Sequence, residues 1–336
     1  MRLYITALRA FLVGLAWAAS AIGSVLLRHD AGALELLWLP SAISVAALFV
    51  ATRETRPLYL TGLGAASLAV HSSFGLGPLA VACYVTANLV EPLIAVAIAR
   101  RVIRSRHLGM LGLGDMLRLF AGAALGACVG ALIAYPFRMD QGWVQLAWWI
   151  CATTLGITVG SPILVYLHGW FRRQKTWRRA LANLPSSFLM ISTAMFVLSL
   201  WVVSRPFFSL TQLVLAGTVF VVVRYGPLAA ATAILGFGLA GTIESLGGRS
   251  PAAYLDYPPF EAAVILQSFM ILMMATSLPL AALLLRNGRL ALRLRLRNAR
   301  MRENLLMLSM AEEIGRIGRW RYDPRTGFQD WSRQMY

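Results

Sequence analysis

Glu91 is the side chain with the clearest chemical potential, because it is a carboxylate in the middle of an apolar run, within the sequence NLVEP at 88–92. Residues three apart lie on one face of a helix, so Asn88 and Glu91 would share a face. The proline that follows, Pro92, frees a backbone carbonyl one turn earlier. Such a face could hold a ligand, a proton or a partner helix, and an interhelical hydrogen bond alone explains it equally well.

Two other residues are candidates for a signal or ligand pocket. Gln267 lies one turn into the last apolar run, where its amide can bond across helices. Trp38 opens the second run in the sequence WLPSAIS at 38–44, with Pro40 two residues later. An interfacial tryptophan anchor and a first-turn proline explain this pair without a ligand.

Interfacial positions also explain several other polar and aromatic residues. His71 lies near the outer end of its run, where solvent can reach it. Most of the remaining tryptophans fit the belt that tryptophan forms at membrane surfaces. These tryptophans are Trp17, Trp143, Trp148, Trp149, Trp170, Trp177 and Trp201.

The sequence contains no arrangement of residues typical of catalysis or metal binding. It has no paired carboxylates, no Ser/His/Asp arrangement and no glycine-rich phosphate loop. Cys83, Cys128 and Cys151 all fall within apolar runs, without paired spacing or a neighbouring histidine cluster. We expect no catalytic residue, no cofactor, no metal site and no disulfide.

The segments that position these side chains are strongly apolar, with 58% hydrophobic and 13% charged residues. A soluble domain has about 25% charged residues, so the composition excludes an ordinary soluble enzyme. Runs of about 18 or more apolar residues recur over the first 285 positions, long enough to cross a hydrocarbon core as helices. This predicts an all-α polytopic membrane protein. The expected spans, about ten in number, are residues 8–27, 36–52, 57–73, 78–99, 117–136, 145–167, 186–204, 207–224, 227–246 and 262–285.

The positive charge follows the loops between these runs. The chain has 31 Lys and Arg residues against 14 Asp and Glu, a formal charge of +17. Topology explains this excess better than a nucleic-acid partner does, because cytoplasmic loops collect positive residues. The distribution places both termini in the cytoplasm, and the first run could instead be a cleaved signal peptide without changing this orientation. The cations left facing outward are Arg28, Arg138, Arg205 and Arg249.

After residue 285 the chain becomes a basic and then mixed helical stretch. Heptad spacing continues for about two heptads, with Asn298 at an intervening core position. Arginines near the membrane also suit anionic headgroups, so membrane lipids are expected partners. Residues 320–332 then predict two short strands around an Asp-Pro-Arg-Thr-Gly turn. An isolated hairpin is marginal, so the chain is expected to stop soon after a soluble domain begins. The apolar heptad positions are Leu294, Met301, Leu305 and Leu308.

The apolar runs resemble the membrane-associated sensor domain of the first MASE type. This domain is an integral-membrane input module of bacterial histidine kinases and of cyclic-di-GMP synthases and phosphodiesterases. Similar sequences often carry an aspartate three residues before Gly156, where this chain has Thr153, so any sensing by that carboxylate would be altered or lost. The matching stretches are WLPSAIS at 38–44, NLVEPL at 88–93, GITVGSP at 156–162, RYGPLAAA at 224–231 and LQSFMILMMATSLPLAALLLR at 266–286. The residues expected to pack helices or mark the family are Pro40, Pro92, Gly156, Pro162, Arg224 and Gly226.

The resemblance implies a sensor over 1–286, a cytoplasmic signalling helix over 287–313 and, at 314–336, the first strands of a PAS-like α+β domain. The function would be signal input in a bacterial inner membrane, in which an unknown small-molecule or membrane-borne cue shifts the helices. The last span would relay that shift to a PAS and output domain absent from this chain. The full-length protein would be a homodimeric diguanylate cyclase, phosphodiesterase or histidine kinase, and this chain no enzyme.

The alternative is a secondary transporter with a substrate site around Asn88 and Glu91. Transporters often have Gly- or Pro-broken spans at matching positions of two inverted halves. Pro92 and Pro162 interrupt spans here, but no convincing internal repeat accompanies them. A transporter would also have no need of a helical stalk that leads into a hairpin. A membrane-embedded lipid or sugar transferase is a more distant possibility.

Overall fold

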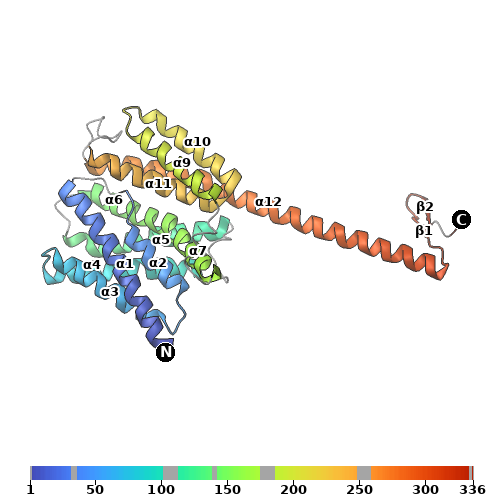
Figure 1. Cartoon of the computed structure of the whole chain (residues 1–336), viewed down its shortest axis with the longest axis horizontal. Helices are drawn as coiled ribbons and strands as arrows, with labels where there is room; N and C mark the ends of the chain where they lie inside the picture. Colours follow the sequence, from blue (N-terminus) through green and yellow to red (C-terminus); the bar gives the residue numbers. More distant parts are fainter. Residues whose placement is uncertain are drawn as a thin grey trace. The chain divides into compact units, whose positions relative to one another are not determined.

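The described part of the chain is helical almost throughout (Figure 1). The computed structural model describes residues 2–31, 36–100, 113–137, 142–174, 186–247, 259–332 and 335. They divide into two compact units, Met1–Leu284 and Leu285–Tyr336. The elements of the first unit are α1 (Arg2–Ala31), α2 (Leu39–Val50), α3 (Arg56–Ser73), α4 (Pro78–Arg100), α5 (Leu113–Ala134), the 3₁₀ turn η2 (Tyr135–Phe137), α6 (Gly142–Leu155), the π-helical turn η4 (Gly156–Gly160), α7 (Ser161–Gln174), α9 (Ser186–Val203), the 3₁₀ turn η5 (Phe208–Leu210), α10 (Thr211–Tyr225), α11 (Pro227–Leu246) and the start of α12 (Pro259–Gly315).

Eight segments of the described residues are long and apolar enough to cross a membrane. All ten predicted spans fall on helices, with α6, η4 and α7 together forming one, but two of the ten do not meet this test. Helix α3 has 18 residues but is not apolar enough, and α2 has only 12 residues. A 12-residue helix is about 18 Å long, which is shorter than a hydrocarbon core. The prediction of a full helical span over 36–52 is therefore wrong.

The three residues before α2 account for the missing length. Residues 36–38 are not helical, and at about 3.3 Å each they add about 10 Å to the helix. Non-helical backbone is tolerated at membrane depth only where protein satisfies its polar groups. Here the Trp38 amide donates to the Ala152 carbonyl at 3.0 Å, and the Leu36 carbonyl accepts from Gln267 Nε2 at 3.3 Å. A buried broken segment thus takes the place of a longer helix.

Helix α5 packs closely on α4 through a line of glycines spaced four apart. A Cβ at Gly126 would lie 2.6 Å from the Glu91 carbonyl oxygen, and one at Gly130 would overlap the Glu91 side chain. A Cβ at Gly122 would lie 3.1 Å from the Ala95 carbonyl oxygen. Small residues at this spacing let membrane helices approach until their backbones touch. Because these glycines have no side chains, α4 and α5 can lie this close together.

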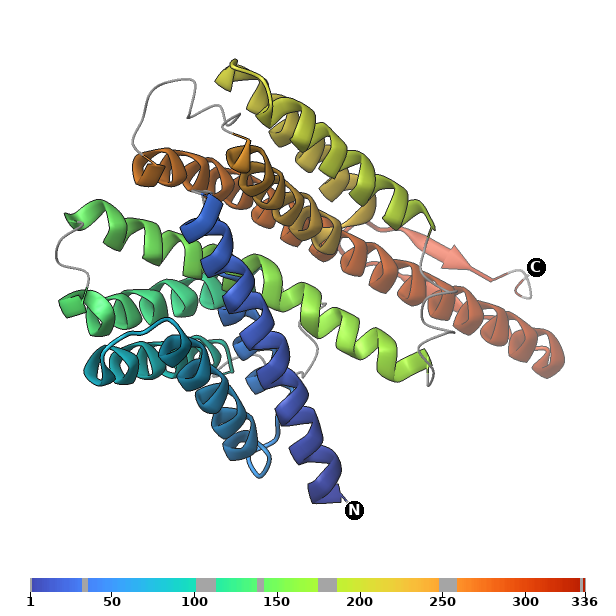
Figure 2. The ribbon, with the colours of Figure 1, turned by 60° about the vertical axis from the view of Figure 1, so that its left-hand side comes forward.

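Helices α9, α10 and α11 and the first part of α12 form a second group, while α1 runs along α2 and α3 (Figure 2). Phe237 of α11 packs on Phe269 of α12 with ring centroids 5.2 Å apart. Gly238 and Gly241 of α11 receive the Leu37 and Leu36 side chains, respectively. These glycines permit close contact, and their partners lie in the segment before α2.

The second unit consists of the rest of α12 and an antiparallel hairpin of β1 (Trp320–Tyr322) and β2 (Gln329–Trp331). The predicted hairpin is confirmed, with Trp320 opposite Trp331. Its turn is held by Asp323, whose carboxylate accepts a hydrogen bond from the Arg325 amide at 3.0 Å. This bond, with others from Thr326, holds the pKa of Asp323 below its usual range. Gly327 adopts a φ of 69°, which favours glycine at the end of this turn.

The α4–α5 contact makes Gly126→Ala a sensitive test of the packing. The added methyl group would press on the α4 backbone, so we expect the free energy of unfolding to fall by about 1–3 kcal/mol. Thermal unfolding in detergent measures the change. Gly169→Ala is the matched control, because a Cβ at Gly169 meets nothing within 4 Å. Equal unfolding temperatures for the two variants would contradict the close packing.

Candidate functional site

Glu91 is completely buried in the middle of α4, at 0% exposure. Both carboxylate oxygens accept hydrogen bonds from other helices. Ser41 Oγ of α2 donates to Oε2 at 3.1 Å, and Trp149 Nε1 of α6 donates to Oε1 at 2.9 Å. One side chain therefore joins three helices. This matters energetically because a buried carboxylate without partners is far more costly than one with its oxygens satisfied.

Asn88 lies one turn before Glu91 but has a different partner. It is 4% exposed, and its Nδ2 donates to Ser67 Oγ of α3 at 3.1 Å. His71, one turn further along α3, bonds through Nδ1 to the Ser67 carbonyl at 2.7 Å. Asn88 Oδ1 is buried without a hydrogen-bond partner in the described structure. The two polar residues of α4 thus tie that helix to separate neighbours.

A chain of aromatic rings connects these two polar contacts. His71 stacks on Tyr84 of α4 with ring centroids 5.1 Å apart, and Tyr84 stacks on Trp149 at 6.0 Å. Trp17 of α1 contacts the His71 ring at 6.4 Å. The path from Trp17 to Trp149 therefore ends at the indole that bonds to Glu91. Four helices, α1, α3, α4 and α6, contribute to it.

Gln267 and Trp38 come together at the broken segment before α2. Gln267 is 0% exposed, and besides its bond to the Leu36 carbonyl its Nε2 reaches the Trp148 carbonyl at 3.5 Å. The predicted cross-helix bond of Gln267 is therefore present. The Trp38 amide bonds to Ala152 of α6, while its indole Nε1 is buried without a hydrogen-bond partner among the described residues.

Helix α6 links the two sets of candidate residues. Trp149 carries the indole that donates to Glu91, and the preceding residue, Trp148, offers its carbonyl to Gln267 of α12. A movement of α6 therefore affects both contacts at once. The sequence gives no sign of this, because tryptophans in apolar runs fit an interfacial belt. That interpretation is wrong for Trp17 and Trp148, which are buried in the bundle.

The proline and glycine candidates mark the places where helices break or touch. Pro40 is buried in the first turn of α2, and Pro92 lies inside α4 beside Glu91. A Cβ at Gly156 would overlap the Trp38 carbonyl, so only glycine lets η4 pack on the broken segment. Pro162 lies at the start of α7, directly after that π-helical turn. A proline there lacks the amide that would continue the helical ladder, which fits the local change of helix type.

The remaining two candidates lie at the end of α10. Gly226 has a φ of 86°, a conformation that favours glycine, and it turns the chain from α10 into α11. Arg224 is exposed, with its guanidinium 5.4 Å from the centre of the Tyr225 ring. Both residues therefore lie at the end of α10, and they are distant in sequence from Glu91 and Gln267.

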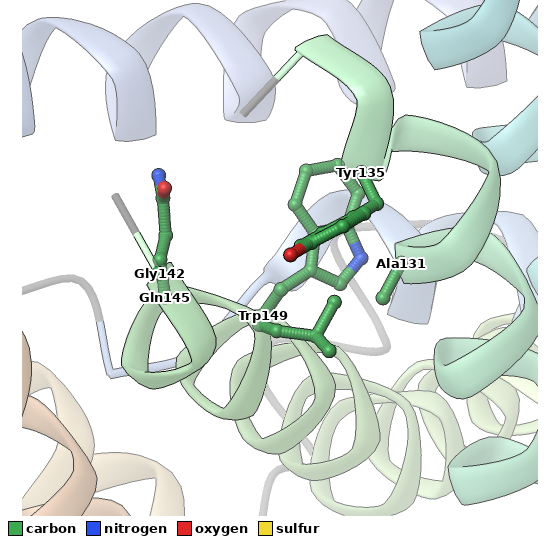
Figure 3. Close-up of a pocket in the computed structure, with 6 residues that line it drawn as sticks. Ala131, Tyr135, Gly142, Gln145 and Trp149 are labelled. Atoms are coloured by element: carbon green, nitrogen blue, oxygen red, sulfur yellow. The ribbon is translucent and has the colours of Figure 1, made fainter. Parts of the chain in front are cut away.

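A shallow hollow lies where η2 and α6 approach each other (Figure 3). It is lined by Ala131, Tyr135, Gly142, Gln145, Leu146 and Trp149. Trp149 thus borders the hollow while its indole nitrogen bonds to Glu91. Tyr135 and Gln145 were not predicted as site residues, since nothing in their sequence spacing distinguishes them from other polar residues at span ends. The described residues contain no group of three or more His, Cys, Asp or Glu side chains able to hold a metal ion.

Residues 7–287 match the family model MASE1, which covers most of the chain. No significant match was found among curated proteins or among solved structures. The matched region contains α1 from residue 7 onward, every element from α2 to α11 and the first part of α12, and therefore Glu91, Trp149 and Gln267.

The hydrogen bonds of Glu91 predict different effects for two substitutions. Glu91→Leu removes the acceptor for the Trp149 indole, and a buried donor without an acceptor costs about 1–3 kcal/mol. Glu91→Gln keeps one acceptor oxygen for Trp149, and the Ser41 hydroxyl can accept from the new amide, so the loss should be smaller. Thermal unfolding measures both, with Glu261→Leu at an exposed position of α12 as control. Equal stability of the Leu and Gln variants would show that these bonds contribute nothing.

Proposed function

Because the chain belongs to the MASE1 family of membrane sensor domains, we propose that it is the input module of a bacterial signal-transduction protein. Such modules are typically not catalytic themselves. A cue from the periplasm or the membrane shifts the bundle, and α12 carries that shift into the cytoplasm. A PAS domain and then a diguanylate cyclase, phosphodiesterase or histidine kinase would receive it.

The observation that supports this relay most directly is the contact of Gln267. Its amide holds α12 to the Leu36 carbonyl and approaches the Trp148 carbonyl, next to the residue that bonds to Glu91. A displacement of Glu91 or Trp149 can therefore be passed to α12 through α6 alone. Beyond the membrane region the same helix continues to Gly315. A ligand shifts such a system only if it binds the two arrangements with different affinity.

The proposed orientation, with both termini in the cytoplasm of an inner-membrane protein, agrees with the position of Arg100. This residue ends α4, and its guanidinium donates to the Leu48, Phe49 and Ala51 carbonyls at the end of α2 at 2.6–2.9 Å. The carboxyl ends of α2 and α4 therefore lie on the same side. Both are placed on the cytoplasmic side by the distribution of positive charge.

A parallel homodimer through α12 also forms part of the proposal. The heptad positions are all open to solvent in the single chain, so a second copy could cover them. Burial of such a stripe is the usual driving force for a coiled coil. Their exposed fractions are 60% for Leu294, 59% for Met301, 55% for Leu305 and 49% for Leu308.

The transporter alternative gains no support at Glu91. Both of its oxygens are engaged by Ser41 and Trp149, and the Gly130 backbone closes on its side chain. A substrate there would have to displace these contacts. No observation in the described structure favours transport over signal input.

Insertions into α12 test the relay. The chain would be fused after Tyr336 to a diguanylate cyclase reporter, and cyclic-di-GMP measured per amount of fusion protein. One alanine added after Leu296 turns the following helix by about 100°, whereas seven turn it by about 700°, which is about 20° short of two full turns. We expect the single insertion to change output several-fold and the seven-residue insertion to restore it. Identical output from all three lengths would rule out transmission through this helix.

Substitution of Gln267 tests the link between α12 and the bundle in the same fusion. Gln267→Leu removes the amide that holds the Leu36 carbonyl, so the output should shift several-fold and respond less to Glu91→Gln. Gln212→Leu, at an exposed position of α10, is the matched control. Size-exclusion chromatography establishes that each variant folds. A Gln267→Leu fusion that folds and signals like the Gln212→Leu control would contradict the proposed link.

A further inference from the structure

The hollow between η2 and α6 contains an unsatisfied acceptor. Gln145 is only 6% exposed, and its Oε1 is buried without a hydrogen-bond partner in the described structure. A buried polar atom left unpaired is costly, so such an atom at the edge of a hollow indicates a missing donor. Figure 3 shows Gln145 on one side of this space and Tyr135 with Trp149 on the other.

The hollow is small, which limits what can supply that donor. Its empty volume of about 240 Å³ includes space open to solvent, and the enclosed part is about the size of a water molecule. A large ligand would not be enclosed here. A compact head group on a longer molecule, with the remainder outside, fits this shape.

Three features of the lining favour a positive charge on that group. Tyr135 and Trp149 present aromatic rings, whose faces attract cations. Trp149 also donates to the buried Glu91 side chain at 2.9 Å, which fixes the position of its ring beside the hollow. The amide oxygen of Gln145 is the third favourable group, and no described residue that lines the hollow carries a positive charge.

We propose that this hollow binds a primary ammonium group, with its N–H donating to Gln145 Oε1 and its charge against the Trp149 and Tyr135 rings. The proposal rests on the proposed sensor function and names the chemistry of its cue. In the proposed orientation η2 and the start of α6 lie on the periplasmic side, so a free amine or the ethanolamine headgroup of a phospholipid can reach the hollow. Occupancy would act on Trp149, and through it on Glu91.

Binding of three small probes tests the chemistry of the group. The full chain in phosphatidylcholine nanodiscs would be titrated with ethylammonium, with ethanol and with tetramethylammonium, and the dissociation constants measured by saturation-transfer NMR. Ethylammonium has both charge and donor, ethanol has only the donor and tetramethylammonium only the charge. We expect ethylammonium to bind at least about tenfold more tightly than either. Equal binding of ethylammonium and ethanol would overturn the proposal.

Variants locate the site. Gln145→Leu should weaken ethylammonium binding by about tenfold, while Gln145→Glu should strengthen it, because the new carboxylate adds an opposite charge. Gln212→Leu, on α10, should leave the binding unchanged. Unaltered affinity in both Gln145 variants would show that the amine binds elsewhere. This equilibrium measurement does not depend on any output domain, so it can fail or succeed independently of the insertion experiment.

Nanodiscs of phosphatidylethanolamine distinguish the two sources of the ammonium group. If the lipid headgroup fills the hollow, ethylammonium should bind the unmodified chain more weakly in these nanodiscs than in phosphatidylcholine nanodiscs. The same change of lipid should raise the unfolding temperature of the unmodified chain more than that of the Gln145→Leu variant. If a free amine is the occupant, the change of lipid should alter neither quantity. In both cases ethylammonium must bind in phosphatidylcholine nanodiscs, and this binding must depend on Gln145. If no such binding is found in phosphatidylcholine nanodiscs, the proposal is contradicted.

Discussion

The buried carboxylate of Glu91 is the interaction on which the arrangement of α2, α5 and α6 around α4 depends. It lies in the middle of a membrane helix, where an unpartnered charge or polar group is strongly unfavourable. Ser41 and Trp149 meet this requirement from two other helices, and Gly126 and Gly130 allow α5 to close over the site. The positions of α2, α5 and α6 around α4 are therefore constrained by one side chain.

The same requirement explains the break before α2. Three non-helical residues within the bundle need partners for their backbone groups, and α6 and α12 provide them through Ala152 and Gln267. Gly156 and Gly241 leave the space in which this segment packs. A longer α2 would have satisfied its own backbone and would not have needed these contacts. The break thus makes α2 dependent on contacts with both α6 and α12.

The helices, the hairpin and the cross-helix bond of Gln267 could be predicted from the sequence, because apolar length, turn residues and an amide in an apolar run are local signals. The partners could not. Whether Glu91 meets Trp149 or a ligand depends on how helices distant in sequence pack, and a tryptophan inside the bundle has the same local pattern as one at the interface. Helix α2 was predicted too long because apolarity continues through Leu36 and Leu37, which are buried without being helical.

In the proposed mechanism, helix α6 connects the hollow to α12. It borders the hollow through Gln145 and Trp149, bonds to Glu91, and offers the Trp148 carbonyl to Gln267 of α12. Hydrogen bonds weaken steeply with distance. A small rotation of α6 would therefore strengthen either its bond to Glu91 or its contact with Gln267 at the expense of the other. The contact of α6 with Glu91 of α4 is 2.9 Å long, whereas its contact with Gln267 of α12 is 3.5 Å long, so the side facing α12 is the looser one. A group bound at Trp149 would then change the free-energy difference between two positions of the last helix, which is the minimum that a relay requires.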